Sequence, residues 1–258
     1  MDGTSYRRIV LSPHLDDGPL SCGGAIHHWA AAGEPVLVVT FMTGDPPAGD
    51  LSPFAHYQHA GWQLTARKAY IVRRAEEVAA LQVLGADFHH VGLLDCIYRA
   101  DDAGFFYTSD EAIFGFTHPG DDRLAEEMAR RLALLGPLES TTIVYAPLAV
   151  GNHIDHQLVR QAAERWRGRE LIYYEDFPYA GQDAPVELDA TPLLISLSKE
   201  DIEAKVKAIG CYRSQIRFLF GTRAKMVARV WDHCRRVAGK NGWAERYWQK
   251  VGQPAQSG

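Results

Sequence analysis

The sequence predicts an α/β fold in which a doubly wound, mostly parallel sheet is flanked by helices in a Rossmann-like arrangement. Apolar runs typical of strands alternate along the chain with segments whose apolar residues recur at helical spacing. The run PVLVVTFM at residues 35–42 is continuously apolar, which is typical of a parallel strand buried on both faces. No repeat, low-complexity tract or linker divides the sequence. We therefore expect one domain over residues 1–258.

The first segments predict a right-handed strand–helix–strand unit. A strand is expected at residues 8–12, a helix at 20–32 that ends at Gly33, and a second strand at 35–42. Residues 43–65 contain three prolines and are expected to form a long loop. Because loops of this length are uncommon unless they are functional or disordered, this one is a candidate wall of a binding cleft.

The alternation continues to about residue 209. Residues 66–84 predict a helix that ends at Gly85, and residues 95–120 predict a second long loop, rich in aromatic residues and aspartate. Ser198 and Asp201 form the capping box of a later helix. The remaining expected elements are strands at 87–94, 141–148, 171–176 and 193–197 and helices at 121–135, 152–167 and 199–209. Beyond these, the chain to about residue 248 is expected to be helical and basic, with a frayed C-terminal end.

Composition excludes several classes of protein. The formal net charge of -5 argues against a general nucleic-acid binder, which would usually be basic. No apolar run approaches the ~20 residues that cross a bilayer, and the first residues, MDGTSYRR, lack the apolar centre of a signal peptide. The four cysteines show no CxxC spacing, which indicates reduced thiols. We therefore expect a cytoplasmic protein without a membrane span.

A turn rich in ligand-type side chains follows the first predicted strand. Residues 11–24 read LSPHLDDGPLSCGG, which places His14, Asp16 and Asp17 together directly after Pro13. Two adjacent carboxylates repel each other, and a bound cation would offset that cost. A surface turn is an equally good interpretation of this stretch alone, because aspartate favours turns and helix N-caps.

A second cluster follows the strand predicted at residues 141–148. Residues 151–156 read GNHIDH, with Asn152 as the expected N-cap and two histidines on one face of the first helical turn. The partial positive charge of a helix N-terminus favours neutral imidazoles, which is the form that binds metal. The alternative is structural, with His156 packed in the core and His153 on the surface.

Together the two clusters favour a metal site. Both follow the carboxyl ends of predicted buried strands, where open α/β sheets place their ligands. They supply more than the three nitrogen and oxygen ligands of a catalytic zinc, and no cysteine is adjacent to close the coordination sphere. Such a set leaves a position for water and an acid to serve as a base.

The sequence resembles the PIG-L/LmbE-like deacetylases at three places. PHLDDGPLSCGG is similar to the PHxDDxxLxxGG signature of that family, and HIDH to its HPDH-type motif. Arg73 and Glu76, followed by Ala80 and Leu84-Gly85, resemble its RxxE helix. The resemblance implies the LmbE-like deacetylase fold. It also implies a zinc-dependent hydrolase that removes an N-acyl group, commonly acetyl, from an amino sugar or glucosamine conjugate.

Transferred to this sequence, the resemblance assigns a role to each residue of the two clusters. It implies that Asp16 is the general base and that His153 stabilises the developing oxyanion. The implied metal ligands are His14, Asp17 and His156. Zinc is the expected cofactor, although ferrous iron accepts the same ligands.

Asp155 lies between the two histidines of the second cluster and is expected to orient one of them. The expected partner of the chain is a small-molecule N-acyl amino sugar or glycoconjugate. No nucleic acid is expected, and a homo-oligomer is compatible with the sequence.

Substrate contacts are expected from Arg73, Asp95 and Arg99. For Arg73 the alternative is an exposed ion pair with Glu76, and for Arg99 it is a place in a solvated loop with Tyr98. The aromatic run at residues 105–107 is expected either to stack on a sugar ring or to pack the loop.

The sequence departs from the family pattern at three positions. Gly18 stands where many members have glutamate, which affects the rigidity of the turn more than the chemistry. Gly151 stands where family members of thiol biosynthesis tend to have tyrosine. Leu15 stands where proline is more usual, and this PHLDD form resembles relatives of antibiotic and glycoconjugate pathways.

Two other functions fit the sequence less well. A non-catalytic sugar- or nucleotide-binding protein on the same fold would have no need of Asp16. A nucleotide-dependent transferase lacks support, because no GxGxxG or P-loop pattern follows the first strand.

Overall fold

The computed structural model describes residues 5–135, 139–166, 170–179, 189–240 and 242–251. Seven strands form one sheet in the order β3-β2-β1-β6-β7-β9-β8. The first five strands in this order are parallel, and β9 pairs antiparallel with both β7 and β8. The strand bounds are β1 Arg8–Ser12, β2 Val36–Thr40, β3 Asp87–His90, β6 Ile143–Pro147, β7 Glu170–Tyr174, β8 Ala190–Leu197 and β9 Trp243–Lys250. The predicted mostly parallel sheet is confirmed.

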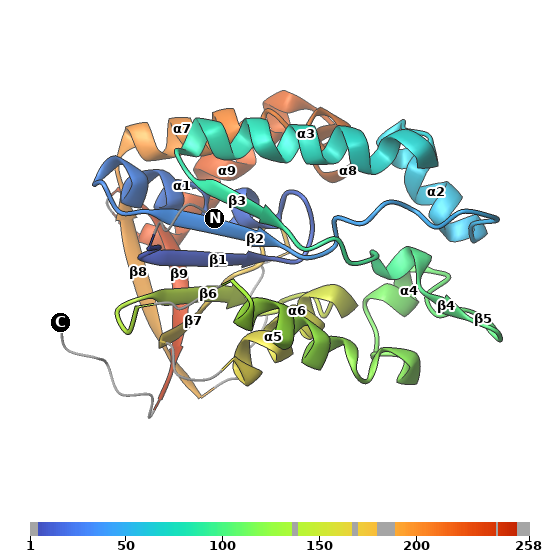
Figure 1. The fold of residues 1–258 in the computed structure, drawn as a ribbon. Helices are drawn as coiled ribbons and strands as arrows, with labels where there is room; N and C mark the ends of the chain where they lie inside the picture. The colour runs from blue at the N-terminus through green and yellow to red at the C-terminus, as the bar shows by residue number, and fades with distance from the viewer. Residues whose placement is uncertain (1–4, 136–138, 167–169, 180–188, 241, 252–258) are drawn as a thin grey trace.

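Helices cover both faces of this sheet (Figure 1). Helices α1, α3, α7, α8 and α9 lie above it in that view, and α5 and α6 lie below. The parallel strands point toward the side where α2, α4 and the small β4–β5 ribbon lie. The helix bounds are α1 Asp17–Ala31, α2 Pro53–Trp62, α3 Ala66–Leu84, α4 Asp110–Ile113, α5 Leu124–Ala133, α6 Ile154–Arg165, α7 Lys199–Ile209, α8 Arg213–Phe220 and α9 Arg223–Ala238.

The central strands are apolar on both sides because helices bury both faces of the sheet. Along β1, Ile9 and Leu11 pack in the core toward α5 and α6, while Val10 packs in the core toward α1 and α3. Leu37 and Val38 on β2 divide in the same way. This division explains the continuous apolar run of the sequence, since neither face of β2 is exposed.

The glycine pair of α1 lets that helix approach the antiparallel end of the sheet. A Cβ on Gly24 would lie 2.5 Å from Leu197 Cδ1, and one on Gly23 would lie 3.0 Å from Lys205 Cγ. At this contact Lys205 Nζ is 2.5 Å from Glu245 Oε1, and the same carboxylate accepts the Gly24 N–H. The polar contacts of Lys205 and Glu245 come from α1, α7 and β9, so this buried ion pair joins the three elements.

The first predicted long loop and the C-terminal region differ from the prediction in their secondary structure. The expected loop at residues 43–65 contains α2, whose N-cap Ser52 accepts the Ala55 N–H at 3.0 Å and whose first residue is Pro53. The C-terminal region was expected to be helical throughout, but β9 follows α9 as a sheet strand. The expected frayed end lies largely outside the described residues.

The second predicted loop, at residues 95–120, is also structured. It contains two short 3-10 helices at Cys96–Tyr98 and Pro119–Asp121 together with the β4–β5 ribbon and α4. The β4 and β5 strands are Ala100–Asp101 and Gly104–Phe105. Helix bounds shift as well, since α1 begins at Asp17 instead of residue 20, and residue 167 of the helix expected at 152–167 lies outside the described part of the chain.

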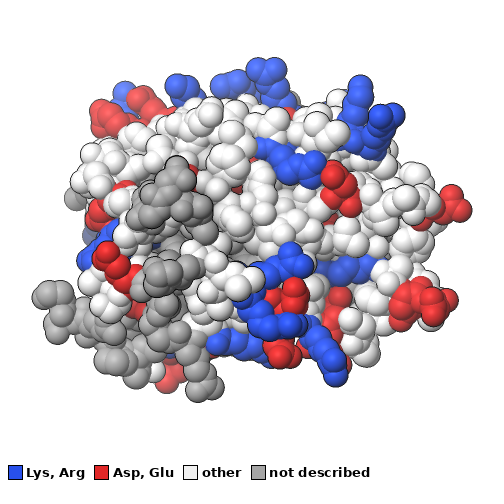
Figure 2. All heavy atoms as spheres, in the orientation of Figure 1, with Lys and Arg blue, Asp and Glu red and all other residues white. Residues whose placement is uncertain are grey.

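The thiols, the helices and the charges of one face bear on the expectations from composition. All four cysteines are free of disulfides. No described helix has both the length and the apolar character that a membrane span requires. On the face drawn in Figure 2, basic and acidic side chains are interspersed instead of forming one basic surface.

Glu77 on α3 is a buried carboxyl that joins three elements. It accepts hydrogen bonds from Thr40 Oγ1 on β2, at 2.9 Å, and from the hydroxyl of Tyr212 at the start of α8. Burial outweighs these two bonds and raises the pKa of Glu77 from 4.5 to about 8. The folded protein therefore holds a proton that the unfolded chain releases between these pH values. The stability that depends on this proton is complete below the lower value and is lost as the pH rises through the upper one.

We expect Glu77→Gln to remove this pH dependence. Between about pH 5 and about pH 9, the free energy of unfolding of the parent protein should fall by a few kcal/mol more than that of the variant, at about 1.4 kcal/mol for each unit by which the pKa is raised. Urea denaturation across the pH range measures both proteins. The control is Glu126→Gln, because Glu126 is exposed on α5. Parallel pH profiles of the parent and Glu77→Gln would contradict the assignment.

Candidate metal and active site

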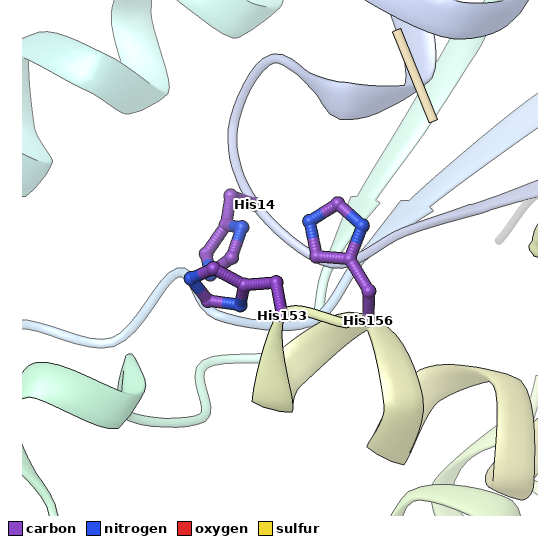
Figure 3. Close-up of side chains that lie close together, drawn as sticks. All are labelled: His14, His153 and His156. Carbon is purple, nitrogen blue, oxygen red and sulfur yellow. The ribbon is translucent and has the colours of Figure 1, made fainter. Parts of the chain in front are cut away.

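The site lies where the strand order of the sheet reverses. Strand β1 pairs with β2 on one side and with β6 on the other, and the chain leaves both β1 and β6 at the same edge. The turn after β1 carries His14, and the first turn of α6 carries His153 and His156, so the three rings gather at one place (Figure 3). Doubly wound sheets bind ligands at this switch point.

Ser12 fixes the turn that carries the first cluster. Its hydroxyl donates to the His14 carbonyl at 2.7 Å and accepts the Gly18 N–H at 2.9 Å. The side chains of Asp16 and Asp17 are buried at this turn. Gly18, where the family pattern has glutamate, thus contributes its backbone N–H to the rigidity of the turn.

The second cluster begins with a different cap from the one expected. His153 is the N-cap of α6, and its Nδ1 accepts the Asp155 N–H at 3.2 Å. Asn152, the predicted N-cap, has a positive φ of 64° and donates its amide to the carbonyls of Phe114 and Gly115. Because Nδ1 of His153 is an acceptor, the proton of its neutral ring lies on Nε2.

The donors of the first cluster meet those of the second around one carboxylate oxygen. Asp17 Oδ2 is 3.0 Å from His14 Nδ1 and 3.3 Å from His156 Nε2. Ligand bonds of ~2.1 Å in a tetrahedral site place donors about 3.4 Å apart, so these separations fit a shared cation. One nitrogen of each imidazole, His153 included, lies within 4.8 Å of the others.

Each of the two histidines has a carboxylate on its outer nitrogen. His14 Nε2 is 3.0 Å from Asp155 Oδ2, and His156 Nδ1 is 2.7 Å from Asp176 Oδ1. Such bonds hold the proton on the outer nitrogen and turn the inner lone pair toward a metal. Asp155 therefore orients His14 of the first cluster, instead of His153 or His156, its expected partners. Asp176 is a site residue that the sequence prediction misses. It is the last residue of the strand predicted at 171–176, so the rule that sites lie at the carboxyl ends of parallel strands could have found it.

The electrostatics of the cluster favour a bound positive charge. Burial opposes protonation of His156, but Asp17 and Asp176 outweigh it and raise the pKa of His156 to about 10. Asp155 and Asp17 outweigh burial in the same way and hold the pKa of His14 well above its usual range. Burial and the two neighbouring imidazoles instead lower the pKa of His153 to about 3. A divalent cation would satisfy the excess of carboxylates while leaving all three rings neutral.

Asp16 is the carboxylate of the turn that has no imidazole partner in the described structure. Its Oδ1 lies 3.7 Å from Nη2 of Arg73, and its side chain is buried. Burial raises the pKa of Asp16 to about 6, because Arg73 offsets only part of the effect and Asp17 adds to it. A carboxylate with a pKa near the working pH is suited to accept and return a proton.

A cavity of about 330 Å³ opens over these residues. Helices α2, α3, α8 and α9, the turn after β1 and the α4 segment contribute to its wall. The lining residues that the site chemistry uses are His14, Asp16, Asp17, Arg73, Asp95 and His153, and apolar walls come from Trp62, Phe114, Tyr179, Phe218 and Leu219. The volume suits a small ligand such as a single sugar ring with its substituent.

Arg73 and Asp95, two of the expected substrate contacts, line the cavity. The Arg73 guanidinium lies over Trp62, 4.6 Å from the ring centroid, and its buried Nε has no hydrogen-bond partner among the described residues. The alternative ion pair with Glu76 is wrong, because Glu76 accepts from Ser214 instead. Asp95 Oδ2 accepts the Tyr70 hydroxyl at 2.7 Å and lies 3.8 Å from His14 Nε2.

Arg99 is not among the described residues that line this cavity. Its side chain is buried between Asp155 and Asp121, so neither the expected substrate contact nor the alternative solvated loop matches its place. The aromatic run at residues 105–107 packs the loop, with Tyr107 fully buried.

Comparison with known proteins identifies the family. The family model PIG-L, described as GlcNAc-PI de-N-acetylase, matches residues 9–166, which include every motif discussed above. The chain belongs to the PIG-L family. The resemblance inferred from the sequence motifs is thereby confirmed.

Members of the PIG-L family resemble the chain over most of its length. It is 29% identical to 2'-N-acetylparomamine deacetylase of Streptomyces fradiae over 90% of this chain and 79% of the relative. The zinc-inhibited form of teicoplanin deacetylase Orf2 superposes with a TM-score of 0.83 at 28% identity, covering 95% of this chain and 99% of the other. The A40926 pseudoaglycone deacetylase Dbv21 gives a TM-score of 0.75 at 30% identity, with 98% and 100% covered.

Proposed function

We propose that this protein is a divalent-metal-dependent hydrolase that removes the acetyl group from an N-acetylated amino sugar within a glycoconjugate. The observation that carries the proposal is the meeting of His14 and His156 at one oxygen of Asp17, with Asp16 beside them on the wall of the cavity that His14 and Asp17 also line. Membership in the PIG-L family and the amino-sugar deacetylases among the relatives support the same reaction.

In this proposal the metal ligands are His14, Asp17 and His156. The nitrogen and carboxylate donors suit zinc, and ferrous iron accepts the same set. When bound there, the metal supplies Lewis-acid activation of water and of the amide carbonyl. Asp155 and Asp176 hold the outer ring protons and so keep both imidazoles in the ligand tautomer.

Asp16 is proposed to move the proton of the reaction. Its carboxylate accepts a proton as a water oxygen forms a bond to the amide carbon. It then returns this proton to the amide nitrogen, so that the C–N bond breaks to give the amine and acetic acid, whose remaining proton passes to the amine or to solvent to leave acetate. A pKa of about 6, raised by burial, suits both steps near neutral pH.

His153 is proposed to stabilise the tetrahedral oxygen. Burial and the neighbouring imidazoles keep its pKa at about 3, so the ring is neutral at pH 7. Since Nδ1 accepts the Asp155 N–H, Nε2–H is the donor left for the oxyanion. A fixed donor of this kind requires no reorganisation when charge develops.

Arg73 and Asp95 are proposed to position the sugar. The buried Nε of Arg73, which has no hydrogen-bond partner in the described part of the chain, and the carboxylate of Asp95 offer a donor and an acceptor to sugar hydroxyls. Trp62 and Phe218 supply apolar walls on the same side. Because a cavity of about 330 Å³ holds little more than one sugar unit, the remainder of the glycoconjugate would extend from its mouth.

Acetate release from a defined panel tests the proposal. Protein stripped of metal is titrated with Zn²⁺ or Fe²⁺ from substoichiometric amounts, since a relative is known in a zinc-inhibited form. The panel comprises N-acetylglucosamine, an N-acetylated aminoglycoside and a glycopeptide carrying N-acetylglucosamine. We expect acetate release from at least one conjugate and none from metal-free protein. Sugar binding without release from any member, with metal bound, would favour the non-catalytic binding protein.

A further inference from the structure

A buried chain of charged groups runs from the proposed metal ligand His14 away from the cavity. His14 Nε2 is 3.0 Å from Asp155 Oδ2, and Asp155 Oδ1 is 2.6 Å from Nη1 of Arg99. Nη2 of Arg99 is in turn 3.1 Å from Asp121 Oδ2. Tyr107 donates its hydroxyl to the same oxygen of Asp121 at 2.7 Å. No member of this chain is more than 9% exposed.

Asp155 has a contact at each of its oxygens: a hydrogen bond at Oδ2, and at Oδ1 an ion pair with Arg99 in which Oδ1 accepts no hydrogen bond from a described residue. Oδ2 accepts the Cys96 N–H at 3.0 Å in addition to facing His14, and Oδ1 faces Arg99. The carboxylate has no exposed surface, so a rotation of its plane would break contacts that water could not replace. The orientation of this carboxylate is therefore set by Arg99 and by the backbone of the segment that carries it.

Arg99 is in turn held by a pair of carboxylates. Its planar guanidinium bridges Asp155 and Asp121 and lies 5.4 Å from the centroid of the Tyr107 ring. A fork with several donors in fixed geometry can bridge two carboxylates, whereas a lysine ammonium acts as a point charge. Arg99 and Asp121 also line a second, open cavity of about 870 Å³.

We propose that Arg99, fixed by Asp121 and Tyr107, is a positioning residue that sets metal affinity by holding Asp155 on the outer nitrogen of His14. This inference rests on the proposed function, because it requires His14 to be a metal ligand. Asp155 keeps the ring proton of His14 on Nε2, which leaves the Nδ1 lone pair facing Asp17. Loss of Arg99 would leave Asp155 with one oxygen unpaired in the interior and free to turn from the ring.

The affinity of the metal-free protein for Zn²⁺ tests the proposal without recourse to activity. Competition with a chromophoric chelator gives the Kd of the parent and of each variant. We expect Arg99→Met to raise this Kd roughly 10–100-fold, as loss of an outer partner of a metal ligand does. Arg99→Lys should give a smaller rise, because the charge remains while the bridge is lost. Arg123→Met is the matched control, since Arg123 lines the second cavity but is exposed and outside the chain of contacts.

A second variant and a second measurement separate the outcomes. Asp121→Asn removes charge at the far end of the chain of contacts without altering Asp155. It should raise the Kd for Zn²⁺ about tenfold, and it provides the test even if Arg99→Met fails to fold. With saturating metal, KM should stay at the parent value for every variant that folds. Zn²⁺ affinity equal to the parent in both Arg99→Met and Asp121→Asn overturns the inference alone. A raised KM with unchanged affinity would make Arg99 a substrate contact, and a parent that binds no Zn²⁺ overturns the proposed function together with the inference.

Discussion

The His156→Ala variant is expected to lose both its metal and its hydrolase activity. His156 Nε2 faces Asp17 Oδ2 at 3.3 Å, and its Nδ1 is fixed by Asp176 at 2.7 Å. Removing this ring leaves two proposed ligands on one short turn, and neither can span the gap to α6. Because loss of an outer partner alone costs 10–100-fold in affinity, loss of the ligand itself should weaken Zn²⁺ binding by at least about 100-fold.

Two measurements on His156→Ala distinguish metal loss from misfolding. Metal content after dialysis against a buffered Zn²⁺ concentration reports binding, and circular dichroism with urea denaturation reports the fold. The control is His56→Ala, since His56 is exposed on α2 and should leave metal content at the parent value. A folded His156→Ala protein that retains a full equivalent of metal would show that the ligand set is wrong.

The first cluster could be predicted in detail because its geometry is local. His14 and Asp17 belong to one turn, and Pro13 ends the strand before them, so sequence neighbours fix their separation. The second cluster could be placed at the same edge because parallel strands deliver their ends together. The roles of Asp16 and Asp17, however, follow from which of them meets His156, and spacing alone does not contain that contact.

Contacts distant in sequence explain what could not be predicted at the site. Arg99 is one of the expected substrate contacts, with a place in a solvated loop as the alternative. It is instead buried between Asp155 and Asp121, and Asp155 is 56 positions further along the chain. The ion pair with Asp155 determines the place of Arg99, and no local sequence pattern indicates a partner at that separation.

The missed elements of the fold divide in the same way. Helix α2 carries a local signal, the Ser52 cap followed by Pro53, which the prolines of the surrounding stretch obscured. Strand β9 carries no such local signal. Its Glu245 is buried, whereas a buried strand position is recognised in sequence by an apolar residue. Lys205 and the N–H groups of Gly24 and Ala25 satisfy that carboxylate, so tertiary contacts make the strand possible.

The Asp16→Asn variant should keep its metal and lose most of its turnover. Asparagine preserves the shape of the side chain but cannot accept the proton of the attacking water. General acid–base catalysis contributes roughly 10²–10⁴-fold, and kcat should fall by that factor. KM for the conjugate should change little, because Arg73 and Asp95 still line the cavity. Single-turnover acetate release on metal-loaded protein measures the chemical step directly.

Metal content and a matched substitution decide what a loss of turnover means. Asp102→Asn changes an exposed carboxylate between β4 and β5, and it should retain the parent rate. If Asp16→Asn loses its metal, the roles of Asp16 and Asp17 are exchanged, and the oxygen that the two imidazoles share is not a ligand. If the variant keeps both metal and rate, no carboxylate of the turn acts as the base. The predicted pattern, full metal with a slow chemical step, requires that the two adjacent acids divide the work as their contacts do: Asp17 toward the imidazoles and Asp16 toward the cavity.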